Sequence, residues 1–219
     1  MGTLNDIAIG TGTDKSSEIH NYCEKYERTL RMERPGKYKI LEIGVLLGQS
    51  LQMWAEYFFN STIVGIDINE KCAEFESGNI EVEIGSQVDP EFIQQVIEKY
   101  GEFDLIVDDG SHQQKHVIKT FEILFASLKS GGLYVVEDSC CSYWPLYGGG
   151  YKHAGTSIEY FKNLVDDVNF RGLMSQPVRV ARREDRLLKL SQKCPPSPPL
   201  RTDIESIQFI NSMIFITKR

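Results

Sequence analysis

The sequence has few cysteines, and their spacing suits neither a disulfide framework nor a zinc site. There are five in 219 residues, an odd and scattered set in which only Cys140 and Cys141 are adjacent. Neighbouring side chains of a strand point to opposite faces, so this pair is poorly placed to chelate one ion. The pattern indicates a reducing compartment rather than a secreted, disulfide-stabilised protein.

Signals for secretion or membrane attachment are also lacking. The N-terminus has no basic stretch followed by an apolar one, and no apolar run approaches the length of a bilayer span. Asp6 stands where a myristoylation signal needs Ser or Thr. We therefore expect a cytoplasmic protein that does not bind membranes.

Positive charge is scarce as well. Lys and Arg number 24 against 31 Asp and Glu, which gives a formal net charge of −7. Nonspecific nucleic-acid binding depends on Lys and Arg contacts to phosphate, so this balance disfavours it. The one basic cluster, Arg179–Arg186, is interrupted by Glu184 and Asp185 and is interpreted as a solvated face. No nucleic-acid partner is expected.

What the sequence does contain is a regular alternation of strand-like and helix-like segments. Strands are expected at Lys39–Val45, Thr62–Ile68, Ile80–Ile84, Phe103–Val107, Leu133–Val136, Ile204–Phe209 and Met213–Thr217. Helices are expected at Ser17–Arg34, Gly48–Phe59, Asp89–Tyr100, Gln114–Leu128 and Ser157–Val168, and a proline-rich loop at Cys194–Leu200. This order predicts one α/β domain over residues 1–219, with a doubly wound, mostly parallel seven-stranded sheet and a C-terminal antiparallel hairpin.

Two acidic clusters each follow a strand. Asp108 and Asp109 follow one, with His112 three residues on, and Glu137 and Asp138 follow the next. The carboxyl ends of neighbouring parallel strands open onto one crevice, so these side chains are expected to meet. Carboxylates that close repel one another unless a cation joins them. The arrangement favours a divalent metal, Mg²⁺ or alternatively Mn²⁺, with a histidine beside it.

The turn after the first strand stands where nucleotides bind in such folds. A dinucleotide fingerprint has the form Gly-x-Gly-x-x-Gly, but here Leu46 stands where the second glycine should be, two residues after Gly44. A pyrophosphate would meet this bulky side chain, so an adenosyl ligand without phosphates fits better than NAD. Asp67 follows the second strand and can accept hydrogen bonds from both ribose hydroxyls.

These motifs resemble the class I S-adenosylmethionine-dependent methyltransferases, and more narrowly the metal-dependent macrocin- and mycinamicin-type sugar O-methyltransferases. The resemblance extends from about residue 10 to residue 170. The matching stretches are Gly12–Lys15, Leu41–Ser50, Ile63–Asp67, Gly85–Asp89, Phe103–His112, Gly131–Asp138 and Ser142–Trp144.

The resemblance implies a role for each matching position. For the cofactor, Glu42, Gly44 and Ser50 would line the methionine part, with Gly48 in the same turn. Asp67 would hold the ribose, and Gln87 and Asp89 would lie near the adenine. Asp108 would also contact the cofactor. Thr13, Asp14 and Lys15, in an N-terminal helical segment of residues 1–36, would close over the site. Asp109, Glu137 and Asp138 would bind Mg²⁺.

The expected activity is methyl transfer from S-adenosylmethionine to a sugar hydroxyl of a glycosylated natural product, nucleotide sugar or glycan. A metal would acidify the hydroxyl, and His112 would accept its proton, since histidine can do so near neutral pH. Residues 139–156, with Tyr143 and Trp144, would form a substrate loop.

Several alternatives stay open at this point. The acceptor could be a small catechol-like diol or an amine, or the chain could bind the cofactor without turnover. Asp108 and Asp109 could cap the following helix. His116 could be a surface or packing residue or a second ligand, and His20 could face the site or not. Tyr143 and Trp144 could anchor a loop without touching substrate. Similar proteins are often homo-oligomers, but the sequence leaves the assembly open.

Overall fold

The computed structural model describes residues 2–169 and 201–219. The segments Arg179–Arg186 and Cys194–Leu200, interpreted above as a solvated face and a proline-rich loop, lie outside these residues. Each helix in the described part of the chain is too short or too polar to cross a membrane.

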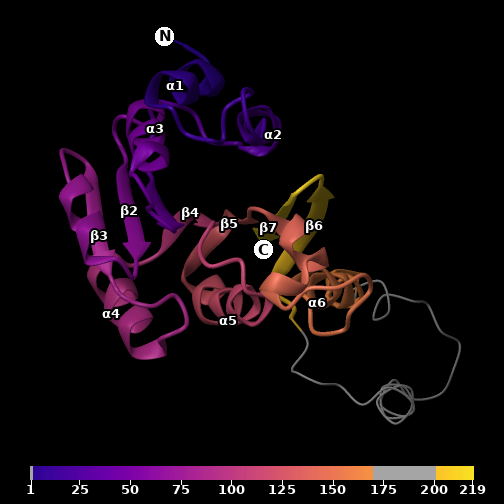
Figure 1. Ribbon diagram of the computed structural model, residues 1–219. Helices are drawn as coiled ribbons and strands as arrows, with labels where there is room; N and C mark the ends of the chain where they lie inside the picture. The colour runs from indigo at the N-terminus through magenta and orange to yellow at the C-terminus, as the bar shows by residue number, and fades with distance from the viewer. Residues whose placement is uncertain (1, 170–200) are drawn as a thin grey trace, which may run out of the picture.

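A seven-stranded sheet forms the centre of the molecule (Figure 1). Its strands are β1 Lys39–Ile43, β2 Thr62–Asp67, β3 Ile80–Ile84, β4 Phe103–Asp108, β5 Leu128–Val136, β6 Ile204–Ile210 and β7 Met213–Lys218. They lie in the order β3-β2-β1-β4-β5-β7-β6, in which β1 to β5 are parallel and β7 is antiparallel to β5 and β6. The predicted fold class, including the C-terminal hairpin, is confirmed.

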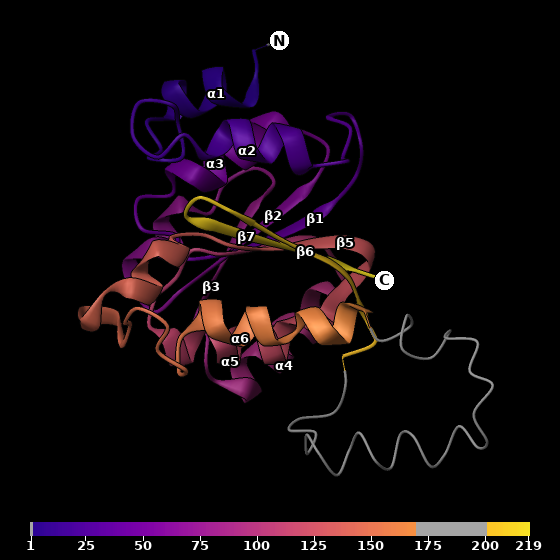
Figure 2. The same cartoon turned by 90° about the vertical axis from the view of Figure 1, so that its right-hand side faces the viewer.

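Helices cover both faces of this sheet (Figure 2). The helices α1 Leu4–Thr11, α2 Tyr22–Thr29 and α3 Gln49–Tyr57 pack on one face, and α4 Pro90–Tyr100, α5 Gln114–Leu124 and α6 Ser157–Asn163 on the other. The described part also contains four short 3₁₀ turns: η1 Glu70–Phe75, η2 Phe125–Ser127, η3 Ser139–Tyr143 and η4 Pro145–Tyr147.

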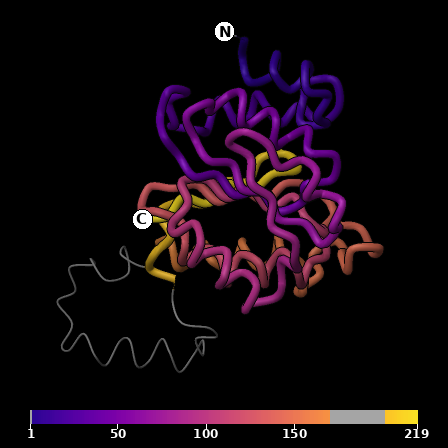
Figure 3. Tube along the Cα trace, turned by 90° about the vertical axis from the view of Figure 1, so that its left-hand side faces the viewer, coloured from indigo at the N-terminus to yellow at the C-terminus, as the bar shows by residue number. Residues whose placement is uncertain are grey.

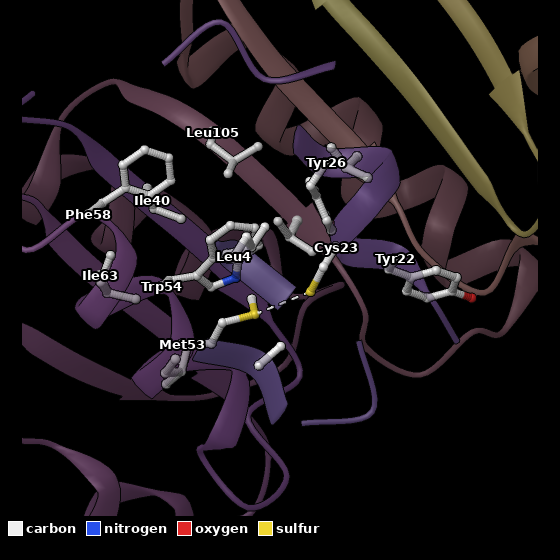
Figure 4. Packing of buried hydrophobic residues seen from close by; sticks show 14 of the residues in the cluster. Leu4, Tyr22, Cys23, Tyr26, Ile40, Met53, Trp54, Phe58, Ile63 and Leu105 are labelled. Atoms are coloured by element: carbon white, nitrogen blue, oxygen red, sulfur yellow. Dashed lines mark hydrogen bonds between the residues drawn. The ribbon is translucent and has the colours of Figure 1, made fainter. Parts of the chain in front are cut away.

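Strand residues alternate between two hydrophobic cores because successive side chains point to opposite faces. Ile40 and Ile63 pack with the N-terminal helices, and their neighbours Leu41 and Val64 pack with α4 and α5. Trp54 of α3 is fully buried in the first core, beside the residues of α1 and α2 (Figure 4). The N-terminal segment is therefore an integral part of one core.

The largest departure from the predicted elements lies in this N-terminal segment. The helix expected over Ser17–Arg34 is shorter and begins only at Tyr22, and the helix α1 before it was not expected. Asn21 has a left-handed φ of 53°, and the N–H groups of Tyr22 and Cys23 both bond to the carbonyl of Lys15. The chain therefore turns on itself between Lys15 and Asn21 instead of continuing as helix. In Figure 3 this segment lies at the indigo end of the tube, over the sheet.

A second departure concerns strand β5. The sequence predicts a helix that ends at Leu128, but this residue begins a longer strand that contains the glycine pair Gly131-Gly132. The pairing of β5 with β4 shifts in register at this point, and Gly131 has a φ of 78°. A β-bulge explains why glycines interrupt the strand without ending it.

Candidate active site

The carboxyl ends of β1, β2, β4 and β5 lie at one level of the sheet. Backbone hydrogen bonds fix that level: the N–H of Gly44 donates to Ile66, that of Asp109 to Ile43, and that of Glu137 to Asp108. The acidic residues that follow β4 and β5 therefore emerge beside the turn that follows β1. This is the crevice that the strand order predicts.

A cavity of about 590 Å³ opens at these strand ends. Most of the predicted site residues line it: Thr13, Asp14, Lys15, Gly44, Ser50, Asp67, Gln87, Asp109, His112 and Asp138. The other predicted residues lie behind its wall or outside it: Glu42, Gly48, Asp89, Asp108 and Glu137. His116 also lines the cavity, and its Nδ1 lies 2.8 Å from the hydroxyl of Ser111.

The turn from β1 to α3 needs glycine at two positions. Gly44 has a φ of 94°, and a Cβ there would lie 2.2 Å from the carbonyl oxygen of Asp109. Gly48 has a φ of 70°, and a Cβ there would lie 2.7 Å from the ring of Phe75. Leu46, between them, is 74% exposed at the cavity. The backbone thus approaches the acidic loop closely, and a large, mostly exposed apolar side chain lines the cavity.

Asp67 at the end of β2 stabilises this turn. Its Oδ2 accepts hydrogen bonds from the N–H groups of Val45 and Leu46 at 2.9 and 3.3 Å, and its Oδ1 accepts from Asn69 at 2.9 Å. Burial alone raises the pKa of Asp67, but these donors outweigh it and hold the pKa below its usual value. Ribose binding by Asp67 stays a prediction, and the carboxylate that it requires is charged and in place.

Glu42 on β1 is fully buried and only partly paired. Its Oε1 accepts a 2.7 Å hydrogen bond from the hydroxyl of Ser50 and lies 3.3 Å from the ammonium of Lys15. Its Oε2 has no hydrogen-bond partner among the described residues. An unsatisfied buried carboxylate oxygen is costly, so this atom suits a ligand that brings a cationic donor. The ammonium group of S-adenosylmethionine is such a donor.

Gln87 and Asp108 form a buried network that holds the acidic loop. The amide nitrogen of Gln87 donates to Asp108 at 3.2 Å and to Thr120 at 2.8 Å, while its oxygen accepts from the N–H of Ser111 at 2.9 Å. The hydroxyl of Tyr134 also donates to Asp108, and burial raises the pKa of Asp108 to about 7. Asp108 therefore contacts the interior rather than the cavity, and its predicted contact with a cofactor stays a prediction.

Asp89 lies away from the cavity in the structure. Its carboxylate accepts hydrogen bonds from the N–H groups of Glu91 and Phe92, which caps α4. The sequence already predicts this N-cap, because proline follows Asp89 at the first helical position.

Three side chains meet at the floor of the cavity. Asp109, His112 and Asp138 each present one ligand atom within 4.8 Å of the others. The Nε2 of His112 lies 4.0 Å from Oδ1 of Asp109 and 3.7 Å from Oδ2 of Asp138. His112 and Asp138 both have left-handed backbone angles, with φ of 55° and 48°. Such angles are unfavourable for residues other than glycine and are found most often at functional sites.

Lys15 brings a positive charge to these acids from the N-terminal segment. Its side chain is 1% exposed, and its ammonium lies 2.5 Å from Oδ2 of Asp109 and 2.6 Å from Oε2 of Glu137. Burial lowers the pKa of Lys15, but the carboxylates of Asp109, Glu137 and Glu42 outweigh burial and hold the pKa well above its usual value. Lys15 thus stays charged and contacts acids from three strands.

Glu137 is placed differently from the metal ligand that the resemblance implies. It is 2% exposed, its Oε2 binds Lys15, and its Oε1 accepts a hydrogen bond from the hydroxyl of Tyr26. Burial raises the pKa of Glu137, although Lys15 opposes this. Both oxygens therefore already have a protein partner, and metal binding by Glu137 stays a prediction.

The donor set fits a divalent cation. The ammonium of Lys15 contacts Glu42, Asp109 and Glu137, whereas Asp138 lies beside His112, and both Asp109 and Asp138 border the cavity. Carboxylate oxygens are the preferred ligands of Mg²⁺, and a manganese ion accepts them together with imidazole. The residues that present open ligand atoms are Asp109, Asp138 and His112.

Two functional candidates, Tyr22 and Tyr26, are absent from the site predicted from sequence. Their hydroxyls donate to Asp138 and Glu137, respectively. The spacing of four residues places them on one face of α2, where the sequence suggests packing against the core. A buried tyrosine hydroxyl needs a hydrogen-bond partner. The sequence therefore signals a polar contact for these residues but does not identify the partner.

The segment proposed as a substrate loop contacts His112 through one aromatic side chain. The ring of Tyr147 meets the His112 ring edge-on, with centroids 6.0 Å apart. Tyr143 and Trp144 are about half exposed, and Leu146 is 80% exposed. Gly149 lies so close to the backbone that a Cβ would be 2.6 Å from the carbonyl oxygen of Cys141. The loop therefore folds back on itself, exposes apolar side chains and contacts His112 through Tyr147.

The chain belongs to the rhamnosyl O-methyltransferase/CmcI family, whose model matches residues 35–168. It is 38% identical over 183 residues to an L-olivosyl-oleandolide 3-O-methyltransferase of Streptomyces antibioticus, with 76% of this chain and 46% of the relative covered. It is 35% identical over 193 residues to the mycinamicin VI 2''-O-methyltransferase of Micromonospora griseorubida, with 84% and 48% covered.

A solved structure of the MycE methyltransferase, from the mycinamycin biosynthetic pathway, has the same fold. The structure holds Mg, SAH and mycinamycin VI, and it superposes with a TM-score of 0.83 at 30% identity. The match covers 99% of this chain and 53% of that one. The chain spans about half the length of the curated relatives it matches. The resemblance inferred from the motifs is confirmed at the level of the family.

Proposed function

We propose that this chain is a metal-dependent O-methyltransferase that moves a methyl group from S-adenosylmethionine to a sugar hydroxyl of a glycosylated small molecule. One observation carries the proposal. Asp109 and Asp138 each direct one carboxylate oxygen toward Nε2 of His112, at the floor of a cavity bordered by the β1–α3 turn. The names of the relatives and the ligands of the MycE structure support the same activity.

The cofactor would lie over the β1–α3 turn, where Leu46 stands in place of the second glycine of a dinucleotide fingerprint. Glu42 would pair its free Oε2 with the ammonium group, Ser50 would help to orient the methionine part, and Asp67 would accept from the ribose. S-adenosylmethionine, when bound, supplies a methyl group on a positively charged sulfur.

The acceptor would enter from the side of the aromatic loop. His112 would take the proton of the acceptor hydroxyl on Nε2 while the oxygen forms its bond to the methyl carbon and the carbon–sulfur bond breaks. Asp109 and Asp138 would stabilise the imidazolium that results, because each has an oxygen within 4.0 Å of this nitrogen. A divalent cation held by Asp109, Asp138 and a predicted ligand Glu137 would supply Lewis acidity. Tyr147 would keep water away from His112.

The test is methyl transfer by the purified chain to a panel of rhamnosides and olivosides, read by mass spectrometry of the products. We expect a methylated glycoside with S-adenosylmethionine and Mg²⁺, and none after EDTA treatment. The Asp109→Ala variant should be inactive, whereas Asp166→Ala, which removes an exposed carboxylate outside the cavity, should be active. Methylation of catechols but not glycosides, or equal activity in EDTA, would contradict the proposal.

The acceptor within this class, the cytoplasmic location and the assembly stay predictions. A homo-oligomer is an expectation from similar proteins, and size-exclusion chromatography with light scattering measures it directly.

A further inference from the structure

Three polar side chains of the N-terminal segment, those of Lys15, Tyr22 and Tyr26, contact acids of the site. No sequence motif accounts for the two tyrosines. We propose that Lys15, Tyr22 and Tyr26 are positioning residues, which orient the acidic side chains for a metal ion. This inference rests on the proposed function, because it assumes that those acids hold a cation. It goes further in assigning this task to a segment outside the sheet.

In both Asp109 and Asp138, the two carboxylate oxygens have different partners. Asp109 directs Oδ2 to the ammonium of Lys15 at 2.5 Å and Oδ1 toward His112 at 4.0 Å. Asp138 directs Oδ1 to the hydroxyl of Tyr22 and Oδ2 toward His112 at 3.7 Å. In each case one oxygen is held by the N-terminal segment and the other faces the cavity. Such a contact selects one rotamer of the carboxylate and leaves a free oxygen for the ion.

Glu137 is held from the same segment through both oxygens, by Lys15 and by Tyr26. These contacts link residues more than a hundred positions apart in the chain. Carboxylates that bind metals are commonly hydrogen-bonded in this way by groups behind them. Lys15 also lowers the mutual repulsion of Asp109 and Glu137, which would otherwise push their side chains apart.

The segment that carries the three residues is firmly placed. Lys15 is 1% exposed and Tyr26 is fully buried, with its ring edge-on to Trp54 at 5.0 Å. The carbonyl of Lys15 accepts from the N–H groups of Tyr22 and Cys23, so the lysine and the start of α2 form one unit. The N–H of Leu4 donates to Glu27 at 2.7 Å and joins α1 to α2. A rigid support is what a positioning role requires.

The experiment measures binding of Mn²⁺ to the full chain by electron paramagnetic resonance, for wild type, Tyr22→Phe and Tyr26→Phe. Each variant removes one hydroxyl and keeps the ring, so the core stays filled. We expect the dissociation constant for Mn²⁺ to rise about 10-fold or more in each, the usual effect of losing a group behind a metal ligand. Affinity for S-adenosylhomocysteine, measured by calorimetry, should stay unchanged.

Tyr100→Phe is the matched control. The Tyr100 hydroxyl donates to Glu81 and Glu83 on β3, away from the cavity, so its loss removes similar hydrogen bonds without touching the site. Its Mn²⁺ affinity should equal that of wild type. The two tyrosine variants decide the inference, because Lys15→Met would remove a positive charge beside the proposed cation site as well as two hydrogen bonds.

Unchanged Mn²⁺ affinity in both tyrosine variants would overturn the inference, and so would a wild-type chain that binds no Mn²⁺. A drop equal to that of the control would overturn it as well. The proposed function fails in a different way, through a wild-type chain that binds Mn²⁺ tightly and methylates no glycoside. In that case weakened Mn²⁺ binding by Tyr22→Phe and Tyr26→Phe would still support the positioning role.

Discussion

The turn after β1 and the acidic site between β4 and β5 are built in opposite ways. The turn is made by backbone: glycines at positive φ and N–H groups that donate to Asp67, a residue about twenty positions away. The acidic site is made by side chains, and its partners come from 94 to 122 residues earlier in the chain. A turn of this kind can therefore be predicted from a short stretch of sequence, whereas the contacts that hold the acids depend on the tertiary fold.

The largest effect should follow the loss of Asp109, a proposed metal ligand of the acidic site. Asp109→Ala removes an oxygen that faces His112, and its loss should reduce kcat by about 10³-fold or more, since a Lewis acid contributes several kcal/mol to such reactions. Binding of S-adenosylhomocysteine, measured by calorimetry, should be largely spared because the β1–α3 turn is untouched. Full activity of this variant in metal-free buffer would show that the acidic site does not contribute a metal to catalysis.

Removal of the proposed base should have the next largest effect. His112→Ala should lower kcat about 10²- to 10⁴-fold, the usual contribution of a general base, with little change in cofactor affinity. The measurement is the initial rate of methyl transfer at saturating glycoside across a range of pH. An unaltered rate and pH profile would assign the proton transfer to another group.

A change in the turn should act on stability rather than on chemistry. Gly44→Ala should lower the free energy of unfolding by about 3 kcal/mol or more, because the left-handed backbone is strained and the new Cβ collides with the Asp109 carbonyl. Gly78→Ala is the control: Gly78 also has a positive φ, of 60°, but nothing lies within 4 Å of its Cβ position. Its cost should be about 1 kcal/mol. Urea denaturation measures both, and equal losses would refute the close approach of turn and acidic loop.

The smallest expected effect is the contribution of Asp67 to the pH dependence of the free energy of unfolding. Its pKa is held below the usual value in the folded chain, so its contribution to stability is complete above about pH 4 and is lost as the pH falls through the folded pKa. Asp67→Asn cannot titrate. The difference in free energy of unfolding between wild type and variant should therefore shrink as the pH is lowered from about 5 toward 2. A difference that stays constant over this range would mean that the N–H donors of the turn do not favour the charged form.

The sheet and the meeting of the acids follow from local patterns in the sequence. The strands β1 to β5 are short apolar runs, and the position of Asp109 and Asp138 after two neighbouring strands is enough to bring them to one crevice. The N-terminal turn is different. Asn21 adopts a left-handed conformation and Lys15 enters a fully buried site, although periodicity favours one longer helix. Tertiary ion pairs outweigh helix propensity here, and no local signal encodes a partner so distant in the chain.

The roles of Asp108 and Glu137 also could not be predicted from the sequence. Both follow a strand in the same way as Asp109 and Asp138, so their position in the sequence does not distinguish them. The structure does: Asp108 binds Gln87 and Tyr134 in the interior, and Glu137 binds Lys15 and Tyr26. Alternation of side chains along the chain sends one acid of each pair inward. The direction is set only when the neighbouring helices are in place.

The central claim is that Asp109 and Asp138 share one divalent cation, with His112 beside it as the proton acceptor. A crystal of the full chain soaked in Mn²⁺ and S-adenosylhomocysteine tests it most directly, through the anomalous signal of manganese. The account predicts a single strong peak within bonding distance of Oδ1 of Asp109 and Oδ2 of Asp138, beside the His112 ring. A fully occupied cofactor with no peak between these atoms, or a peak elsewhere in the cavity, would contradict it.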